Sequence, residues 1–196
     1  MKKLADWLTL RRFNNGLSVA VVFLALYIFF LPLLPELSWW ARHSAPLISS
    51  PVTVSRPTHK LPIPRDNRVV IPALSMDEKI FAGQSVYTVN KGVWIRPNAS
   101  TPDKGGNTVL VGHRFTYTNP RGVFYYLDKL ADGDPITLYW EGKTYTYEVN
   151  GARVVSPSDE TVEAPTPDSR LTLYTCTPLW SLKDRLVVTA ALKEAP

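Results

Sequence analysis

Residues 68–196 are divided into short runs of β-branched and aromatic residues separated by turn residues, and this pattern restricts the fold more than any other feature. Such runs favour strands, and glycine, proline and asparagine mark the turns between them. The 17 prolines in 196 residues also argue against a mostly helical fold. About seven or eight strands in one such segment predict a closed barrel or a sandwich. The candidate elements are strands at Arg68–Ile71, Thr108–His113, Pro135–Trp140, Lys143–Val155, Leu171–Thr175 and Arg185–Leu192, and one short helix at Val123–Ala131.

An uncharged apolar run lies near the N-terminus, at residues 16–34. Nineteen helical residues span roughly 28 Å, close to the thickness of the hydrocarbon core of a bilayer. Basic residues precede the run, and two tryptophans follow it (Lys2, Lys3, Arg11 and Arg12; Trp39 and Trp40). The positive-inside rule therefore predicts a cytoplasmic basic segment at 1–15, a single-pass transmembrane helix at 16–36 and an extracellular remainder anchored to the cell membrane. A cleaved signal peptide is the alternative, but its apolar core is shorter, about 7–15 residues.

Residues 37–67 are rich in proline and show neither a helical nor a strand period. Proline at this density favours an extended, semi-rigid chain. We therefore predict an extracellular linker between the membrane and a domain at 68–196. His43 and His59 fall in this linker, where isolated histidines are expected to be solvated rather than catalytic.

Charge and cysteine content exclude several classes of function. The net charge is +5, and the first 16 residues carry +3 of it, from four basic residues and one acid. The basic character is thus partly N-terminal, and we predict no nucleic-acid partner. The single cysteine rules out an intramolecular disulfide and zinc sites built on two or more cysteines. The sequence contains no phosphate-binding glycine loop, no H-E-x-x-H motif and no G-x-S-x-G motif.

Cys176, His113 and Arg185 are the candidate catalytic residues, because each lies at the end of a predicted strand. A thiol attacks as the thiolate, and a cationic neighbour favours that form of a group whose free pKa is about 8.5. A histidine can protonate a leaving amine, and a guanidinium can donate hydrogen bonds to an oxyanion. Each residue alone also has a structural explanation, such as an arginine paired with Asp184 or Asp159. Together the three suffice for cysteine acyl transfer.

The residues around these three positions resemble the sortase family. The run LTLYTCTP at 171–178, followed by Arg185, is similar to the sortase signature TLxTC…R. Gly112-His113-Arg114 is similar to the sortase strand that carries the catalytic histidine, and the similarity covers about residues 66–193. The nine-residue spacing from Cys176 to Arg185 is closer to classes C, D and E than to class A. The Asp-Pro-aromatic lid motif that is usual in class C is absent from residues 41–67.

This resemblance implies a mainly β fold: a closed eight-stranded sortase-type β-barrel with one or two short helices, preceded by one transmembrane helix. It implies that Cys176 attacks the Thr-Gly bond of an LPxTG-like sorting signal. His113 acts as general acid and then base, and Arg185 holds the substrate and the oxyanion. An amine acceptor, either a peptidoglycan cross-bridge or a pilin lysine, then resolves the thioacyl intermediate. The partners are thus the sorting signals of secreted surface proteins or pilins.

The surroundings of the cysteine are expected to bind this peptide. We expect Thr175, Thr177 and Trp180 to contact it. We also expect the loops at 156–170 and 177–184, which flank the cysteine strand in the sequence, to shape its groove.

The resemblance implies no cofactor and no metal. Some class A sortases bind calcium, but Asp128, Asp132 and Asp134 are interpreted as turn and solvated-face residues. An L,D-transpeptidase is disfavoured, because Thr177 follows the cysteine where those enzymes keep an arginine nearby. The remaining alternative is a catalytically inactive, membrane-anchored β domain that binds a wall or protein partner. Fast alkylation of Cys176 at neutral pH would favour the enzyme.

Overall fold

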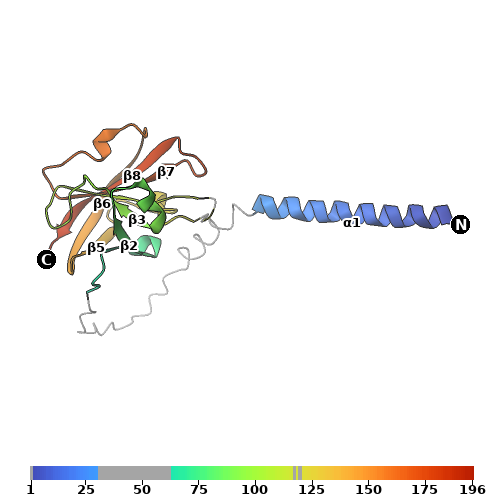
Figure 1. The fold of residues 1–196 in the computed structure, drawn as a ribbon, viewed down its shortest axis with the longest axis horizontal. Helices are drawn as coiled ribbons and strands as arrows, with labels where there is room; N and C mark the ends of the chain where they lie inside the picture. Colours follow the sequence, from blue (N-terminus) through green and yellow to red (C-terminus); the bar gives the residue numbers. More distant parts are fainter. Residues whose placement is uncertain (1, 31–62, 117, 119–120) are drawn as a thin grey trace. The chain divides into compact units, whose positions relative to one another are not determined.

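The computed structural model describes residues 2–30, 63–116, 118 and 121–196. The chain falls into two compact units, Met1–Thr58 and His59–Pro196. The first unit contains helix α1 (Lys2–Phe30; Figure 1). The large apolar side chains near its end, among them Phe23 and Phe29, are exposed.

The predicted membrane anchor overlaps the end of α1. Within the described ranges, the structure contains no helix of sufficient length and apolarity to cross a membrane. Residues 31–36 of the predicted anchor, and residues 37–62 of the predicted linker with His43 and His59, lie outside the described residues. The anchor and the linker therefore stay predictions.

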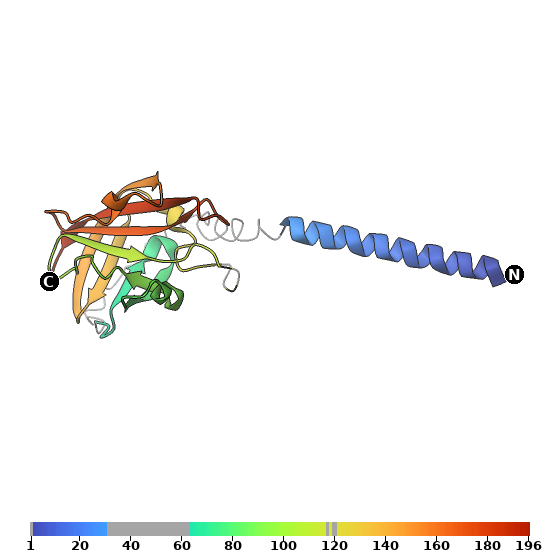
Figure 2. The same cartoon turned by 45° about the horizontal axis from the view of Figure 1, so that its top comes forward.

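The second unit contains a closed barrel with the strand order β1-β2-β3-β4-β7-β8-β6-β5 (Figures 1 and 2). Its strands are β1 (Arg68–Ile71), β2 (Met76–Ala82), β3 (Val93–Ile95), β4 (Asn107–Val111), β5 (Pro135–Trp140), β6 (Lys143–Val155), β7 (Arg170–Thr177) and β8 (Asp184–Glu194). Short 3-10 helices lie in the connections: η1 (Pro72–Leu74), η2 (Val86–Lys91), η3 (Leu127–Lys129) and η4 (Glu160–Val162). The barrel confirms the mainly β prediction and excludes the sandwich.

The strand predictions are confirmed where the sequence is rich in β-branched and aromatic residues. Strands β1, β5 and β6 have the predicted bounds. Glu141 and Gly142 join β5 to β6 with φ values of 50° and 73°, which suits a tight hairpin turn. The predicted helix at 123–131 is wrong in extent, because only the three residues of η3 are helical there. The sequence analysis missed β2, which is rich in charged residues, and the three-residue β3.

The core lies inside the barrel, where inward-facing side chains of the strands meet. Leu110, Leu138, Leu171 and Leu173 are completely buried, as is almost all of Tyr147. Burying each such aliphatic side chain contributes about 1.5–3 kcal/mol. This core fixes the strands and therefore the residues at their ends.

Strands β4, β7 and β8 lie side by side and carry the candidate site. The parallel pairing of β4 with β7 places Val111 opposite Tyr174. The antiparallel pairing of β7 with β8 places Cys176 opposite Arg185. The end of β4, the end of β7 and the start of β8 therefore meet at one edge of the barrel.

Candidate active site

The structure brings His113, Cys176 and Arg185 together at this edge. All three line one cavity of about 190 Å³, together with Trp94, Arg96 and other residues. His113 lies two residues beyond β4, and Gly112 continues the pairing with β7 through its N–H, which donates to the carbonyl of Tyr174 at 3.4 Å. A nucleophile, an acid–base group and a fixed cation thus share one cavity, as cysteine acyl transfer requires.

Cys176 is a free, half-buried cysteine near the end of β7. The Arg185 Nη1 atom donates to the carbonyl oxygens of Leu182 and Asp184, each at 3.1 Å. Within the described residues, Arg185 contacts these carbonyls rather than a carboxylate, so the alternative of a pair with Asp184 or Asp159 is wrong. Among the residues that the structure describes, its positive charge is therefore not paired with a carboxylate.

His113 is held from two sides. Its Nε2 atom lies 2.8 Å from the Oδ1 atom of Asn90, in η2. An amide oxygen only accepts, so in the neutral ring Nε2 carries the hydrogen and Nδ1 is the basic nitrogen. At the backbone of His113, Gly122 packs so closely against the carbonyl group that a Cβ at position 122 would clash with it. Partial burial lowers the pKa of His113 from its ordinary value of 6.5.

The three predicted peptide contacts have different surroundings. Thr175 is buried, and its hydroxyl donates to the carbonyl of Gly112 at 2.8 Å, so it joins β7 to the His113 strand. Thr177 is half-buried, and its Oγ1 accepts from Arg114 at 3.0 Å. Trp180 is 61% exposed and lines a cavity of about 270 Å³ that Cys176 also lines. Trp180 is the most exposed of the three, and Thr175 lines the catalytic cavity despite its burial; peptide binding by all three stays a prediction.

Arg114, which directly follows His113, makes several side-chain contacts that the sequence analysis missed. Its guanidinium donates to Thr177, to the carbonyl of Tyr125 at 3.4 Å and, in an ion pair at 2.9 Å, to Asp128. Arg114 is itself largely buried, with 12% of its side chain exposed. Asp128 is itself exposed and lies in η3, which agrees with its interpretation as a turn and solvated-face residue, and its carboxylate in addition pairs with Arg114. The sequence signal for Arg114 was its position, because it directly follows the candidate histidine in the Gly112-His113-Arg114 motif.

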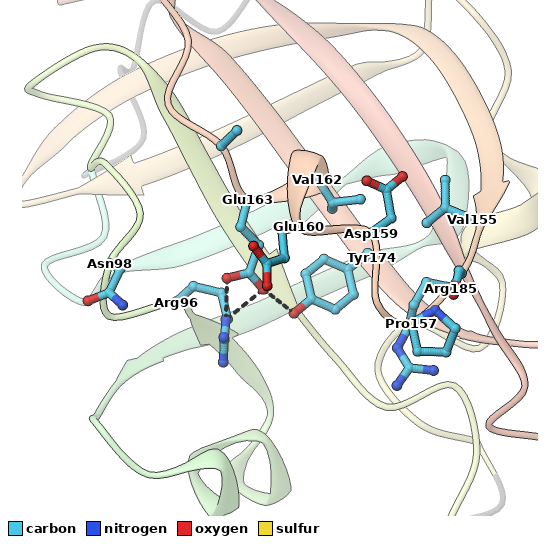
Figure 3. Close-up of a pocket in the computed structure, with 12 residues that line it drawn as sticks. Arg96, Asn98, Val155, Pro157, Asp159, Glu160, Val162, Glu163, Tyr174 and Arg185 are labelled. Atoms are coloured by element: carbon cyan, nitrogen blue, oxygen red, sulfur yellow. Dashed lines mark hydrogen bonds and ion pairs between the residues drawn. The ribbon is translucent and has the colours of Figure 1, made fainter.

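A second polar cluster, also missed, borders a cavity of about 530 Å³ (Figure 3). It consists of Arg96, Glu163 and Tyr174, and Arg185 lines the same cavity. The Glu163 carboxylate accepts from Arg96 Nε at 2.8 Å and from the Tyr174 hydroxyl at 2.6 Å. Segment 156–163 of the predicted groove loop lines this cavity, and segment 178–182 lines the cavity beside Trp180.

Asp132 and Asp134 lie in the turn before β5. Asp134 accepts from the N–H of Ala131 at 2.9 Å, as a turn residue does. In the part of the chain that the structure describes, no three His, Cys, Asp or Glu side chains are grouped to hold a metal ion.

Comparison with known families agrees with this geometry. The family model described as "Sortase domain" matches residues 69–193, which is well over half of the chain. The chain belongs to the sortase family. This family consists of cysteine transpeptidases, and the match includes all three residues of the candidate site.

Two curated sortases match part of the chain. Sortase E1 of Streptomyces coelicolor is 37% identical over 103 residues, covering 47% of this chain and 28% of that protein. Sortase D of Bacillus subtilis is 29% identical over 92 residues, covering 47% of this chain and 43% of that protein. The chain therefore spans less than half of the length of these curated relatives.

Solved sortase structures share the fold. The crystal structure of sortase E1 from Streptomyces coelicolor, with a tripeptide in its active site, is 29% identical with a TM-score of 0.59, covering 68% of this chain and 91% of that one. Sortase C-1 from Actinomyces oris is 30% identical with a TM-score of 0.60, covering 67% and 76%. The Clostridium perfringens sortase D5 transpeptidase is 28% identical with a TM-score of 0.59, covering 66% and 79%. Classes C, D and E are thus all represented among the relatives.

Proposed function

We propose that this sortase is an active cysteine transpeptidase that cleaves an LPxTG-like sorting signal and transfers the acyl product to an amine. The supporting observation is the single cavity lined by His113, Cys176 and Arg185. Cys176 and Arg185 lie on the adjacent strands β7 and β8, and His113 closely follows the end of the neighbouring strand β4, so the backbone fixes their relative positions.

In the first half-reaction, the Cys176 thiolate attacks the threonine carbonyl carbon of the peptide. The oxyanion accepts hydrogen bonds from Arg185. As the C–N bond breaks, His113 gives its proton to the leaving amine, and a thioester remains on Cys176. Because Asn90 accepts from Nε2, the proton moves at Nδ1.

In the second half-reaction, an amine attacks the thioester carbonyl. Neutral His113 takes a proton from the amine nitrogen, the C–S bond breaks, and Cys176 leaves as the thiolate. The enzyme returns to its starting state with no net oxidation, so the reaction needs no cofactor. The amine acceptor in this proposal is a peptidoglycan cross-bridge or a pilin lysine.

We further propose that the N-terminal segment anchors the enzyme to the cell membrane, with the catalytic domain outside. The uncharged run at 16–34, the basic residues before it and the exposed apolar side chains of α1 support this proposal. An anchored enzyme would meet secreted proteins as they emerge from the membrane. Protease accessibility of the barrel in intact cells would test the orientation.

The test of activity is the incubation of the full chain with LPxTG- and LAxTG-type peptides and an amine, followed by mass spectrometry. We expect a thioacyl adduct on Cys176, a cut Thr-Gly bond and a peptide–amine product. Cys176→Ala is the control and should give none of these. Slow alkylation of Cys176 together with no adduct from any peptide would overturn the proposal in favour of an inactive binding domain.

A further inference from the structure

The Arg96–Glu163–Tyr174 cluster joins three segments that are separate in the sequence (Figure 3). Arg96 directly follows β3, Glu163 directly follows η4, and Tyr174 lies in β7, two residues before Cys176. Arg96 Nε lies 2.8 Å from one carboxylate oxygen of Glu163 and 2.9 Å from the other. The Tyr174 hydroxyl donates to the first of these oxygens at 2.6 Å.

The contacts in this cluster are partly shielded from water. The side chains of Arg96 and Glu163 are 29% and 30% exposed, and the Arg96 guanidinium carbon lies 4.6 Å from the centre of the Trp94 ring. Charge-assisted hydrogen bonds are short and strong, and an ion pair this far from full exposure is screened less than a surface pair. Burial raises the pKa of Tyr174, and the adjacent Glu163 raises it further, so the phenol stays protonated and continues to donate.

The cluster lies between two cavities. Arg96, Tyr174 and Arg185 line both the cavity of about 530 Å³ and the catalytic cavity of about 190 Å³. We call residues 156–169, between β6 and β7, the β6–β7 segment. Its first part, 156–163, lines the larger cavity. The cluster is therefore the place where this segment meets the catalytic strands.

We propose that Arg96, Glu163 and Tyr174 are positioning residues that hold the β6–β7 segment against β7 and so set the affinity for the peptide substrate. This inference rests on the proposed function. None of the three reacts with the substrate in our mechanism. Their loss should weaken substrate binding and leave the chemistry of Cys176 intact.

A second set of contacts, made by Asn107, also holds the β6–β7 segment, so loss of the cluster should change only part of the segment. Asn107 Nδ2 donates to the carbonyls of Val162 and Ala164, at 3.1 and 3.0 Å, on either side of Glu163. The backbone of the segment therefore stays attached when the cluster is removed. Variants of the cluster should therefore fold. Only the part of the β6–β7 segment that faces the catalytic cavity should become more mobile.

Two variants that keep the net charge test the proposal in the full chain. The first is Arg96→Met combined with Glu163→Gln, and the second is Tyr174→Phe. The matched control is Lys193→Met combined with Glu148→Gln, which removes an ion pair of 2.9 Å at the other end of β8. The readouts are KM and kcat for the best-cleaved peptide, the rate of Cys176 alkylation, and amide hydrogen exchange of residues 156–169.

We expect the double variant to raise KM about tenfold and Tyr174→Phe to raise it about threefold, with kcat and the alkylation rate within about twofold. Hydrogen exchange should accelerate in residues 156–169 and should not change in the control. An unchanged KM, or a fall of kcat and alkylation without a change in KM, would overturn the inference. If the wild-type chain cleaves no peptide, the proposed function fails, and unchanged exchange in the variants would then separately overturn the positioning role.

Discussion

The two segments that flank β7 are held to the barrel in different ways. The β6–β7 segment (156–169) is fixed by side chains far away in the sequence, Asn107 and Arg96. The segment between β7 and β8, which we call the β7–β8 segment (178–183), contains mostly local hydrogen bonds, such as that from the Ser181 N–H to the Pro178 carbonyl at 3.0 Å. It also leaves Trp180 and Leu182 exposed, by 61% and 75%.

This difference indicates two ways of forming a binding surface. Buried polar contacts of the first segment are satisfied before any ligand arrives, so its position is set in advance. The exposed apolar side chains of the second segment gain stabilisation only when a ligand covers them, at about 25 cal/mol for each Å². We therefore expect the β6–β7 segment to be pre-formed and the β7–β8 segment to adapt to the ligand.

The largest expected effect comes from Arg185, which lies between the two segments. Replacing Arg185 with Met removes the proposed oxyanion donor, and Arg185→Lys keeps the charge but loses the planar fork of donors. We expect kcat to fall by about 10²–10³ for both variants, measured as peptide cleavage. Arg153→Met, at an exposed arginine of β6, is the control. Activity of Arg185→Met near the wild-type level would contradict the role of Arg185.

The next prediction tests the β6–β7 segment at Asn107, the buried residue that holds its backbone. Asn107→Ala leaves the carbonyls of Val162 and Ala164, and the hydroxyl of Thr172, without their partner. Unsatisfied buried groups of this kind should lower the free energy of unfolding by about 2–3 kcal/mol, measured by urea denaturation. The control is Asn150→Ala, at an exposed asparagine, where a change below about 0.5 kcal/mol is expected. Equal losses in the two variants would refute the comparison.

A smaller effect tests the adaptable segment. The Trp180 ring packs against that of Phe115, with ring centres 4.0 Å apart and planes tilted by 56°, and both line the cavity of about 270 Å³ with Cys176. We expect Trp180→Ala to lower kcat/KM for the peptide or the amine by about three- to tenfold, with a stability change below about 0.5 kcal/mol. Tyr87→Ala, at an exposed aromatic residue of η2, is the matched control. A large loss of stability in Trp180→Ala would show that the β7–β8 segment is pre-formed as well.

The smallest effect concerns His113, which belongs to neither segment. Burial lowers the pKa of His113 in the folded chain, so near pH 6 the unfolded chain binds more protons. The free energy of unfolding should therefore fall as the pH drops below about 6.5. The His113→Gln variant should show a smaller fall in the free energy of unfolding, measured by urea denaturation. Part of the fall should remain, because His43 and His59 are present in both chains. An identical pH dependence of the wild type and the variant would contradict the partial burial of His113.

The sequence was sufficient to predict the parts of the fold that depend on local composition. Runs such as 135–140 and 143–155 are recognisable because β-branched and aromatic residues are concentrated there. Strand β2 (MDEKIFA) was missed because three consecutive charged residues, Asp77 to Lys79, interrupt its apolar alternation, and β3 is too short to show a pattern. The strand order, with β4 parallel to β7, comes from long-range pairing that local composition does not encode.

The residues of the candidate site likewise fall into those that the sequence predicts and those that it does not. Cys176, His113 and Arg185 could be predicted because each lies in a short recognisable motif. Asn90 and Arg96 could not, since their partners are 23 and 67 residues away and the closed barrel brings them together. The motifs therefore identify the candidate reacting groups, and the three-dimensional fold identifies the residues that contact them.

The placement of the three candidate residues on or just beyond adjacent strands also has a consequence for how a sortase can diversify. Strands β4, β7 and β8 are joined by backbone pairing, which does not depend on which side chains fill the connections. The β6–β7 and β7–β8 segments could therefore be exchanged between relatives, one at a time, while the reacting groups keep their geometry. A chimera that carries a foreign β7–β8 segment should keep the thiol reactivity of Cys176 and acquire a new preference among its substrates.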